Sequence, residues 1–302
     1  MYKQIIEEIC KELNIKYTYL SKGYITKLEK DNKVKYLSNS KFDLNNYVNG
    51  RILDDKYAFY EVLNNLNIPV CIHNIFYRED NKNDFAIGCN TKKDIIDYFN
   101  KHNKNVVVKP NDGYMGKDVY HITSIDELIE ITNKLFKNRY SIGICPFYNI
   151  KNEYRVIFLD NEIKLLYKKI NPVVVGDGKS TIKELLIKFN PYFFSNLELP
   201  NIILKENEKY TYDFHFNLSK GSIASLDIEK DKYEKISLLA KQVVDKLKLS
   251  FVSIDIIETI DNKLLVLEGN SGVMISKATE FIPNGYEIAK SIYKEAIIKL
   301  FN

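Results

Sequence analysis

The chain has 302 residues, 45% hydrophobic and 28% charged, an ordinary composition for a globular protein that can bury a sizeable core in one domain or in two to three lobes. Its 44 basic and 40 acidic residues give a net charge of only +4, and only four of the basic residues are arginine. No arginine-rich basic cluster is present, so the composition argues against a nucleic-acid-binding protein.

The four cysteines and four histidines show none of the spacings of metal sites or disulfide frameworks, which predicts a reducing compartment and no zinc site. The N-terminal segment 1–13 has apolar residues at positions 5, 6, 9 and 13, typical of an amphipathic helix rather than a signal peptide. No apolar run reaches the length of a membrane span. We therefore expect a cytoplasmic protein without membrane contact.

The first half of the chain predicts several short elements. Residues 1–50 are mixed, with one helix followed by strand-like pieces, and residues 54–66 have helical spacing. The polar, turn-rich segment 78–90 predicts a lobe boundary. After it we expect, in order, a helix from Thr91, strands at 105–110 and 117–122, a helix that begins at Ser124 with a capping box, and a strand that ends near residue 148.

The second half contains two predicted β-hairpins. One turns at Asp160-Asn161 between EYRVIFL and EIKLLYKKI, and the other turns at Asp261-Asn262 between FVSIDIIETI and KLLVLEGN. Between them, VVVGDGKSTIKELL predicts a strand, a glycine turn and a helix, and long helices are expected near 231–248 and 284–301. This mixture predicts an α+β fold with largely antiparallel sheets.

Acidic side chains meet on the second hairpin. With a two-residue loop, Asp255 lies opposite Glu268, and the alternation of side chains puts Asn270 on the same face. Opposed carboxylates repel each other, whereas Mg²⁺ accepts carboxylate, amide and phosphate oxygens. The trio therefore predicts a metal site rather than a solvated acidic face.

Basic side chains occupy the first hairpin, where the same pairing rule places Glu153, Arg155 and Lys168 on one face. A guanidinium at Arg155 suits a phosphate or carboxylate ligand, and a cross-strand salt bridge is the open alternative.

The segment VVVKPNDGYMGKDVY, residues 106–120, places Lys109 at the end of a predicted strand, before a loop with Gly113 and Gly116. Glycines let a backbone fold over phosphates, and a lysine supplies a point charge. The lysine after Gly116 is followed by Asp118, so this is not a P-loop, and for the loop taken alone a hairpin turn is the commoner explanation.

Taken in order, these segments resemble the ATP-grasp superfamily, and within it the ATP-grasp part of cyanophycin synthetases and of bifunctional glutathione-synthesising enzymes. The matching segments cover about residues 52–290: Asp55-Lys56 before a helix, VVVKPNDGYMGKDV, NEYRVIF, NPVVVGDGKSTIKELL, FNLSKGSIASLDI, SIDII and LEGNSGVMI. The resemblance implies two α+β lobes that clamp ATP, with a short N-terminal region at 1–78, a lid subdomain at 79–147 and a C-terminal lobe with the metal site at 148–302.

The resemblance also implies which residues bind ATP. Lys56 and Lys109 match lysines on the phosphates, and the loop 112–117 matches the loop that covers them, with Gly113, Tyr114, Met115 and Gly116. The strand ICPFY would border the adenine through backbone groups of Cys145 and Phe147, and Glu153 matches a carboxylate on the ribose. Asn217 would lie near the phosphates or the metal.

Metal ligands and catalytic residues follow from the same resemblance. Asp255, Glu268 and Asn270 match magnesium ligands, where Mn²⁺ can substitute for Mg²⁺. Arg155 and Lys169 match basic positions near the transferred phosphate or acyl group. Strict hairpin pairing favours Lys168, so Lys169 would need a bulge or a different loop length.

Several positions depart from the family pattern. Cys145-Pro146 stands where many members have an acidic residue, Ser253 stands where D-alanine–D-alanine ligases have arginine, and Asp213 falls where cyanophycin-type sequences tend to be basic. The substrate pocket is therefore expected to differ from that of either namesake. His215 either faces the site or packs elsewhere, whereas the other histidines are expected to be surface or packing residues.

The resulting hypothesis is an ATP-grasp ligase that uses ATP and Mg²⁺ to join a carboxylate to an amine through an acyl phosphate, with an amino acid or peptide as substrate. The filled metal positions favour catalysis over the alternative of a non-catalytic ATP-binding regulatory or scaffolding protein. A ligase that modifies a ribosomal peptide or a carrier protein is a further alternative. The short N-terminal region is compatible with a homodimer that completes the pocket.

Overall fold

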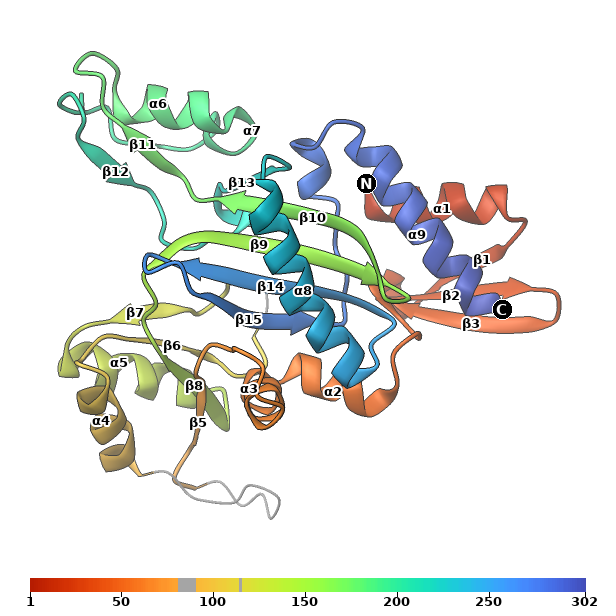
Figure 1. The fold of residues 1–302 in the computed structure, drawn as a ribbon, viewed down its shortest axis with the longest axis horizontal. Coiled ribbons are helices and arrows are strands. Elements are labelled where there is room, and N and C mark those ends of the chain that lie inside the picture. Colours follow the sequence, from red (N-terminus) through yellow and green to blue (C-terminus); the bar gives the residue numbers. More distant parts are fainter. Residues whose placement is uncertain (81–90, 114–115) are drawn as a thin grey trace.

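The computed structural model describes residues 1–80, 91–113 and 116–302, so the predicted site residues Tyr114 and Met115 lie outside the described residues. Figure 1 shows the elements. They are, in chain order, α1 (Tyr2–Glu12), β1 (Lys16–Leu20), β2 (Ile25–Lys30), β3 (Lys33–Ser38), β4 (Lys41–Phe42), α2 (Tyr47–Asp54), α3 (Lys56–Asn65), β5 (Asn74–Tyr77), α4 (Lys92–Lys101), β6 (Val106–Pro110), β7 (Tyr120–Ile122), α5 (Ile125–Phe136), β8 (Ser141–Pro146), β9 (Ile150–Leu159), β10 (Glu162–Ile170), β11 (Val173–Val175), α6 (Ile182–Phe189), α7 (Pro191–Phe194), β12 (Lys209–Thr211), β13 (Ile223–Ser225), α8 (Lys230–Leu247), β14 (Phe251–Thr259), β15 (Leu264–Asn270) and α9 (Gly285–Phe301).

A five-stranded antiparallel sheet with the order β13-β10-β9-β14-β15 forms the centre of the molecule (Figure 1). Side chains alternate between its two faces. Val156 and Ile254 pack towards α8, while Ile157 and Phe251 join the core formed with α1 and α9. Every residue of β14 is buried because both faces of this strand are covered.

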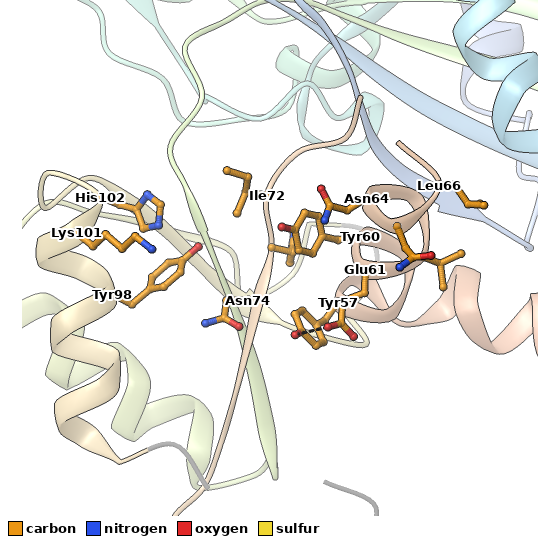
Figure 2. Close-up of a pocket in the computed structure, with 13 residues that line it drawn as sticks. Tyr57, Tyr60, Glu61, Asn64, Leu66, Ile72, Asn74, Tyr98, Lys101 and His102 are labelled. Carbon is orange, nitrogen blue, oxygen red and sulfur yellow. Dashed lines mark hydrogen bonds between the residues drawn. The ribbon is translucent and has the colours of Figure 1, made fainter. Parts of the chain in front are cut away.

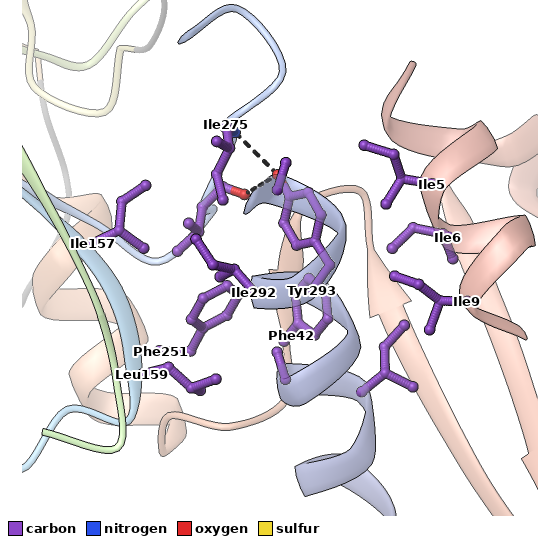
Figure 3. Packing of buried hydrophobic residues seen from close by; sticks show 14 of the residues in the cluster. Ile5, Ile6, Ile9, Phe42, Ile157, Leu159, Phe251, Ile275, Ile292 and Tyr293 are labelled. Atoms are coloured by element: carbon purple, nitrogen blue, oxygen red, sulfur yellow. Dashed lines mark hydrogen bonds between the residues drawn. The ribbon is translucent and has the colours of Figure 1, made fainter. Parts of the chain in front are cut away.

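Helix α1 of the N-terminal region packs against α9, and both contribute to a core against the central sheet (Figure 3). As predicted, the first residues form an amphipathic helix, which buries Ile5, Ile6 and Ile9. The four-stranded meander β1-β2-β3-β4 follows it. The fully buried Tyr293 of α9 uses its hydroxyl to accept from Ile275 N (3.0 Å) and to donate to the Val273 carbonyl (2.9 Å).

A second antiparallel sheet, β5-β8-β6-β7, packs against α4 and α5 around its own apolar core. Thr91 begins α4 with a complete capping box, and the Ser124 hydroxyl accepts from Glu127 N at the start of α5, as the sequence predicts. Because β5 begins at Asn74, this sheet starts before the predicted boundary at residue 79, and the three-part division remains a prediction.

A small arm projects from the central sheet between β10 and β13 (Figure 1). It consists of β11, β12, α6 and α7 around a separate core that includes Leu186 and Phe194. Thr181 and Glu184 form the predicted capping box at the start of α6. In the described parts of the chain, no helix combines the length and apolar character that crossing a membrane requires.

Candidate active site

A bulge in the first hairpin decides which lysine faces the site. The turn forms at Asp160-Asn161 as predicted, and both residues have positive φ (53° and 65°), which suits a tight hairpin turn. Lys164 is an extra residue on β10, because Ile163 pairs with Phe158 and Leu165 with Ile157. The bulge moves Lys169, not Lys168, opposite Glu153.

In the second hairpin, Asp255 pairs with Glu268 as predicted, although the turn differs from the prediction. Glu258 pairs with Leu264, one residue away from the predicted register, so the expected two-residue turn at Asp261-Asn262 is wrong. The extra residue Leu267 on β15 then restores the register. Asp255 lies opposite Glu268 as predicted, and Ser253 lies opposite Asn270.

The neighbouring strands β9 and β14 place Arg155 opposite Asp255. Arg155 donates to both carboxylate oxygens, from Nε at 2.7 Å and from Nη2 at 2.6 Å. Lys169 Nζ donates to Asp255 Oδ2 at 3.0 Å and to Glu153 Oε1 at 2.5 Å. These four side chains form a charge-balanced cluster, hereafter the central ion cluster, in which Asp255, Glu153 and Lys169 are buried.

Burial and charge together shift the pKa values of the two acids of this cluster in opposite directions. Burial alone would raise the pKa of Asp255, but the charges of Arg155 and Lys169 outweigh it and lower this pKa to about 2. For Glu153, burial is the larger effect and raises the pKa to about 7 despite the opposing charge of Lys169. Asp255 is therefore a firmly ionised carboxylate at neutral pH, while Glu153 titrates near neutrality.

The two cations on Asp255 relieve the predicted repulsion between Asp255 and Glu268. An ionised carboxylate has about four acceptor positions, and three of those of Asp255 are occupied. Glu268 accepts only a long bond from Asn270 Nδ2 (3.4 Å) and forms no ion pair with a described lysine or arginine. The open Glu268 oxygens and the Asn270 carbonyl fit a hard cation, with Asp255 as a partial contributor.

No group of three or more His, Cys, Asp or Glu side chains suited to a metal ion occurs in residues 1–80, 91–113 and 116–302. The predicted trio has only two carboxylates, so a cation there would need oxygens from a ligand such as a polyphosphate.

Lys56 reaches the site because α2 and α3 pack closely on β15. A Cβ at Gly269 would lie 2.5 Å from Leu53 Cδ2 and 2.9 Å from Phe59 Cε2, so only glycine allows this approach. The side chain of Asn111, in the loop after β6, accepts from Tyr57 N (3.1 Å), and the Asn111 carbonyl accepts from Lys56 N (3.3 Å). The sequence reasoning did not identify this role of Asn111.

Two lysines of the site form no ion pair with an acidic side chain of the described residues. Lys56 Nζ donates to the Gly113 carbonyl at 2.5 Å, and Lys109 on β6 is 9% exposed. Neither forms an ion pair with a described carboxylate. Burial and then the nearby Lys109 lower the pKa of Lys56, although Glu268 opposes them. Together with the central ion cluster and Glu268, these lysines make four cationic and three anionic side chains, one more cation than anion.

The glycine loop meets the segment that precedes β13. Gly116 has a φ of 65°, and a Cβ at this position would lie 3.0 Å from Asn217 Nδ2. The Asn217 side chain also accepts from Ser219 N at 2.8 Å, which caps a short 3₁₀ helix, Leu218–Lys220. The structure therefore brings the predicted residues Gly113, Gly116 and Asn217 to the same region.

The backbone of the strand predicted to border adenine is largely hydrogen-bonded within its own sheet. Cys145 is buried and pairs with Val107, and Phe147 N donates to the Asn105 carbonyl at 3.0 Å. The Phe147 ring stacks on His121 with a centroid distance of 3.8 Å. His121 is thus a packing residue, as expected, and an adenine contact of Cys145 or Phe147 remains a prediction, as does a ribose contact of the 6% exposed Glu153.

A further hollow lies away from these side chains. It measures about 910 Å³ and lies between α3 and α4, as Figure 2 shows. Tyr57, Tyr60 and Glu61 line it from α3, and Tyr98, Lys101 and His102 line it from α4. No predicted site residue lines this hollow.

No protein-family model matches the chain. One curated protein, the glutathione biosynthesis bifunctional protein GshAB of Enterococcus faecalis, is 28% identical over 166 residues. The match covers 46% of this chain and 22% of the relative, so the chain spans only a minor part of that protein's length.

Solved structures share the fold over almost the whole chain. D-alanyl-alanine synthetase A from Vibrio cholerae has a TM-score of 0.60 at 12% identity, and the match covers 99% of this chain and 92% of that one. A bifunctional glutathione synthetase from Pasteurella multocida has a TM-score of 0.54 at 16% identity, and the match covers 97% and 43%. These proteins are ATP-grasp ligases, and at such identities the likeness shows the fold alone. The chain has the α+β ATP-grasp fold that the sequence resemblance implied.

Proposed function

We propose that this chain, which has the fold of ATP-grasp ligases, is itself an ATP- and Mg²⁺-dependent ligase that joins a carboxylate to an amine. The observation that carries the proposal is the pair Lys56 and Lys109, which has no acidic partner among the described side chains. Lys109 is buried and Lys56 is partly buried, and ammonium groups shielded from water without an ion-pair partner are unfavourable, so such a site favours an anionic ligand. A polyphosphate provides several anionic oxygens together and would also complete the coordination of a cation at Glu268.

In the proposed reaction, the substrate carboxylate attacks the γ-phosphorus of ATP, and ADP leaves. The amine then attacks the acyl phosphate, and phosphate leaves as the amide bond forms. Lys56, Lys109 and the glycine loop would hold the phosphates, with Asn217 beside them. Catalysis would come from positioning and charge stabilisation rather than from a covalent enzyme intermediate.

Arg155 and Lys169 would act where negative charge develops on the transferred group. Their bonds to Asp255 and Glu153 fix both cations on one face of the central sheet. A bound Mg²⁺ would neutralise phosphate charge, and Glu268, Asn270 and the remaining acceptor position of Asp255 would hold it.

An amino acid or a peptide is the substrate class that we propose. The departures from the family pattern at Cys145, Ser253 and Asp213 support a pocket that differs from those of the two namesake families. A homodimer remains part of the proposal as one way to complete that pocket.

The test is the release of phosphate from Mg·ATP by the purified chain across a panel of amino acids and dipeptides, with hydroxylamine present to trap an acyl phosphate. We expect one acid or a small group of acids to stimulate release of ADP and phosphate and to yield a hydroxamate. ATP binding without ADP formation under every acid–amine pair would instead support a non-catalytic nucleotide-binding protein.

A matched pair of variants connects the activity to the site. Glu268→Gln should lower phosphate release by about 10²-fold or more, because it removes the open carboxylate proposed to hold Mg²⁺. Glu162→Gln, at an exposed position on the hairpin turn, should leave it unchanged. Equal activity of the two variants would contradict the assignment of Glu268.

A further inference from the structure

A histidine–aspartate pair lies at the glycine loop and has no role in the proposed reaction so far. His215 Nδ1 forms a very short hydrogen bond with Asp213 Oδ1, and the same oxygen accepts from the backbone N–H of His215 at 2.9 Å. His215 Nε2 is buried and has no hydrogen-bond partner among the described residues. We infer that His215 accepts the proton of the attacking amine and that Asp213 positions it, an inference that rests on the proposed ligase function.

The surrounding charges fix the tautomer that this role requires. The hydrogen bonds of His215 to Asp213 outweigh the effect of burial and lower the pKa of this carboxyl group, so Asp213 is ionised at neutral pH and can only accept. Nδ1 must therefore carry the proton in the hydrogen bond, and the lone pair of neutral imidazole is then on Nε2. Lys220, whose Nζ is 3.4 Å from Nδ1 and 3.8 Å from Asp213 Oδ2, partly balances the aspartate.

The position of His215 places one edge of its ring beside the glycine loop. A Cβ at Gly116 would lie 3.9 Å from His215 Cδ2, the carbon bonded to Nε2, so this edge of the ring faces the glycine loop. The His215 carbonyl accepts from Ser222 Oγ at 3.2 Å, directly before β13, and Ala224 of β13 pairs with Lys169. The imidazole edge thus lies beside the loop proposed to cover the phosphates, and the His215 backbone is bonded next to the strand that pairs with a proposed catalytic lysine.

The other described histidines lack this arrangement. His121 Nε2 is already paired with Asn105 Oδ1 at 2.7 Å. His73 is buried near Lys109 and Lys56, and burial followed by these charges holds its pKa well below the ordinary value. His102 lines the outer hollow between α3 and α4.

The amine enters as an ammonium group, and His215 Nε2 accepts one proton from it, which frees the nitrogen lone pair. This lone pair forms the new bond to the acyl carbon while the bond from that carbon to the phosphate oxygen breaks. Phosphate leaves with the electron pair and takes up the second proton from nitrogen, and the imidazolium of His215 then releases its proton to solvent. General-base catalysis of this kind contributes about 10²–10⁴-fold to a rate.

The experiment compares two nucleophiles in His215→Gln, using the acid and amine that the panel identifies for the wild type. Hydroxylamine is unprotonated at neutral pH, whereas an amino-acid amine is protonated and needs a base. We expect amide formation to fall by about 10²-fold or more while hydroxamate formation stays close to that of the wild type. Asp213→Asn should show the same selective loss to a smaller extent, and His102→Gln should alter neither rate.

Retained hydroxamate formation also shows that the variant is folded and still activates the acid. An equal loss of both products in His215→Gln, or no loss of amide formation, would overturn the inference for His215 and leave the proposed ligase intact. If the wild type itself formed neither hydroxamate nor amide with any acid, the proposed function would be overturned, and this inference with it.

Discussion

Asp255→Asn perturbs the central ion cluster while keeping its shape. Asp255 is 1% exposed and accepts three charge-assisted hydrogen bonds from Arg155 and Lys169. Asparagine retains one oxygen acceptor, but its amide NH₂ group must face a cation, and the two cations then share Glu153 as their sole anionic partner in the cluster. The variant therefore leaves a buried positive charge without compensation.

The loss of stability in Asp255→Asn can be calculated in two ways. A pKa lowered from 3.8 to about 2 corresponds to roughly 2 kcal/mol in favour of the ionised carboxylate. Removal of one partner from a buried ion pair costs about 3–5 kcal/mol. We expect Asp255→Asn to lower the free energy of unfolding by ~2–5 kcal/mol at pH 7, measured by urea denaturation. Because the folded-state pKa is depressed, the difference should shrink as the pH falls below 3.8 towards 2.

A double-mutant cycle with Arg155→Met separates charge loss from general disruption. The double variant should be more stable than the sum of the single effects predicts, by about 1–3 kcal/mol, because it removes the unpaired cation. Asp245→Asn, in the exposed pair with Lys241, is the matched control and should change stability by less than about 0.5 kcal/mol. Additive effects, or equal effects of Asp255→Asn and Asp245→Asn, would refute the reasoning.

Two further predictions concern Glu153 of the central ion cluster and Tyr293 of the core beside α1. Burial raises the pKa of Glu153 from 4.5 to about 7, so between these pH values the native state holds a proton that the unfolded state has released. Wild-type stability should therefore fall relative to that of Glu153→Gln as the pH rises through this window, and parallel urea-denaturation curves would contradict this. Tyr293→Phe leaves Ile275 N and the Val273 carbonyl unpaired in the core and should cost ~1–3 kcal/mol, unlike Tyr192→Phe at an exposed position. Equal thermal stabilities of the two tyrosine variants would disprove it.

The sequence was sufficient for features that depend on local chemistry. The apolar period of the first helix, the capping residues Thr91, Ser124 and Thr181, and the turn at Asp160-Asn161 all occur as predicted. Each is determined by a few neighbouring residues, so a short segment contains the information. The order of the motifs then identified the ATP-grasp fold, which no single motif could do.

Features that depend on distant strands were not predictable in this way. The bulges at Lys164 and Leu267 each shift a register by one residue, and no turn residue marks either of them. Arg155 meets Asp255 because β9 pairs with β14, and hairpin reasoning considers only strands that follow each other in the chain. The pairing of opposed carboxylates therefore suggested a metal as the neutralising group, whereas two cations from a neighbouring hairpin already neutralise Asp255.

The fate of the carboxylate oxygen tests the proposed ligase reaction most directly. The acid found in the panel is labelled with ¹⁸O in its carboxylate, and the products of one reaction with Mg·ATP are analysed by mass spectrometry. Transfer of the γ-phosphoryl group to that acid predicts one ¹⁸O atom in the released phosphate and none in ADP. Unlabelled phosphate, or label recovered in AMP, would contradict an acyl-phosphate ligase.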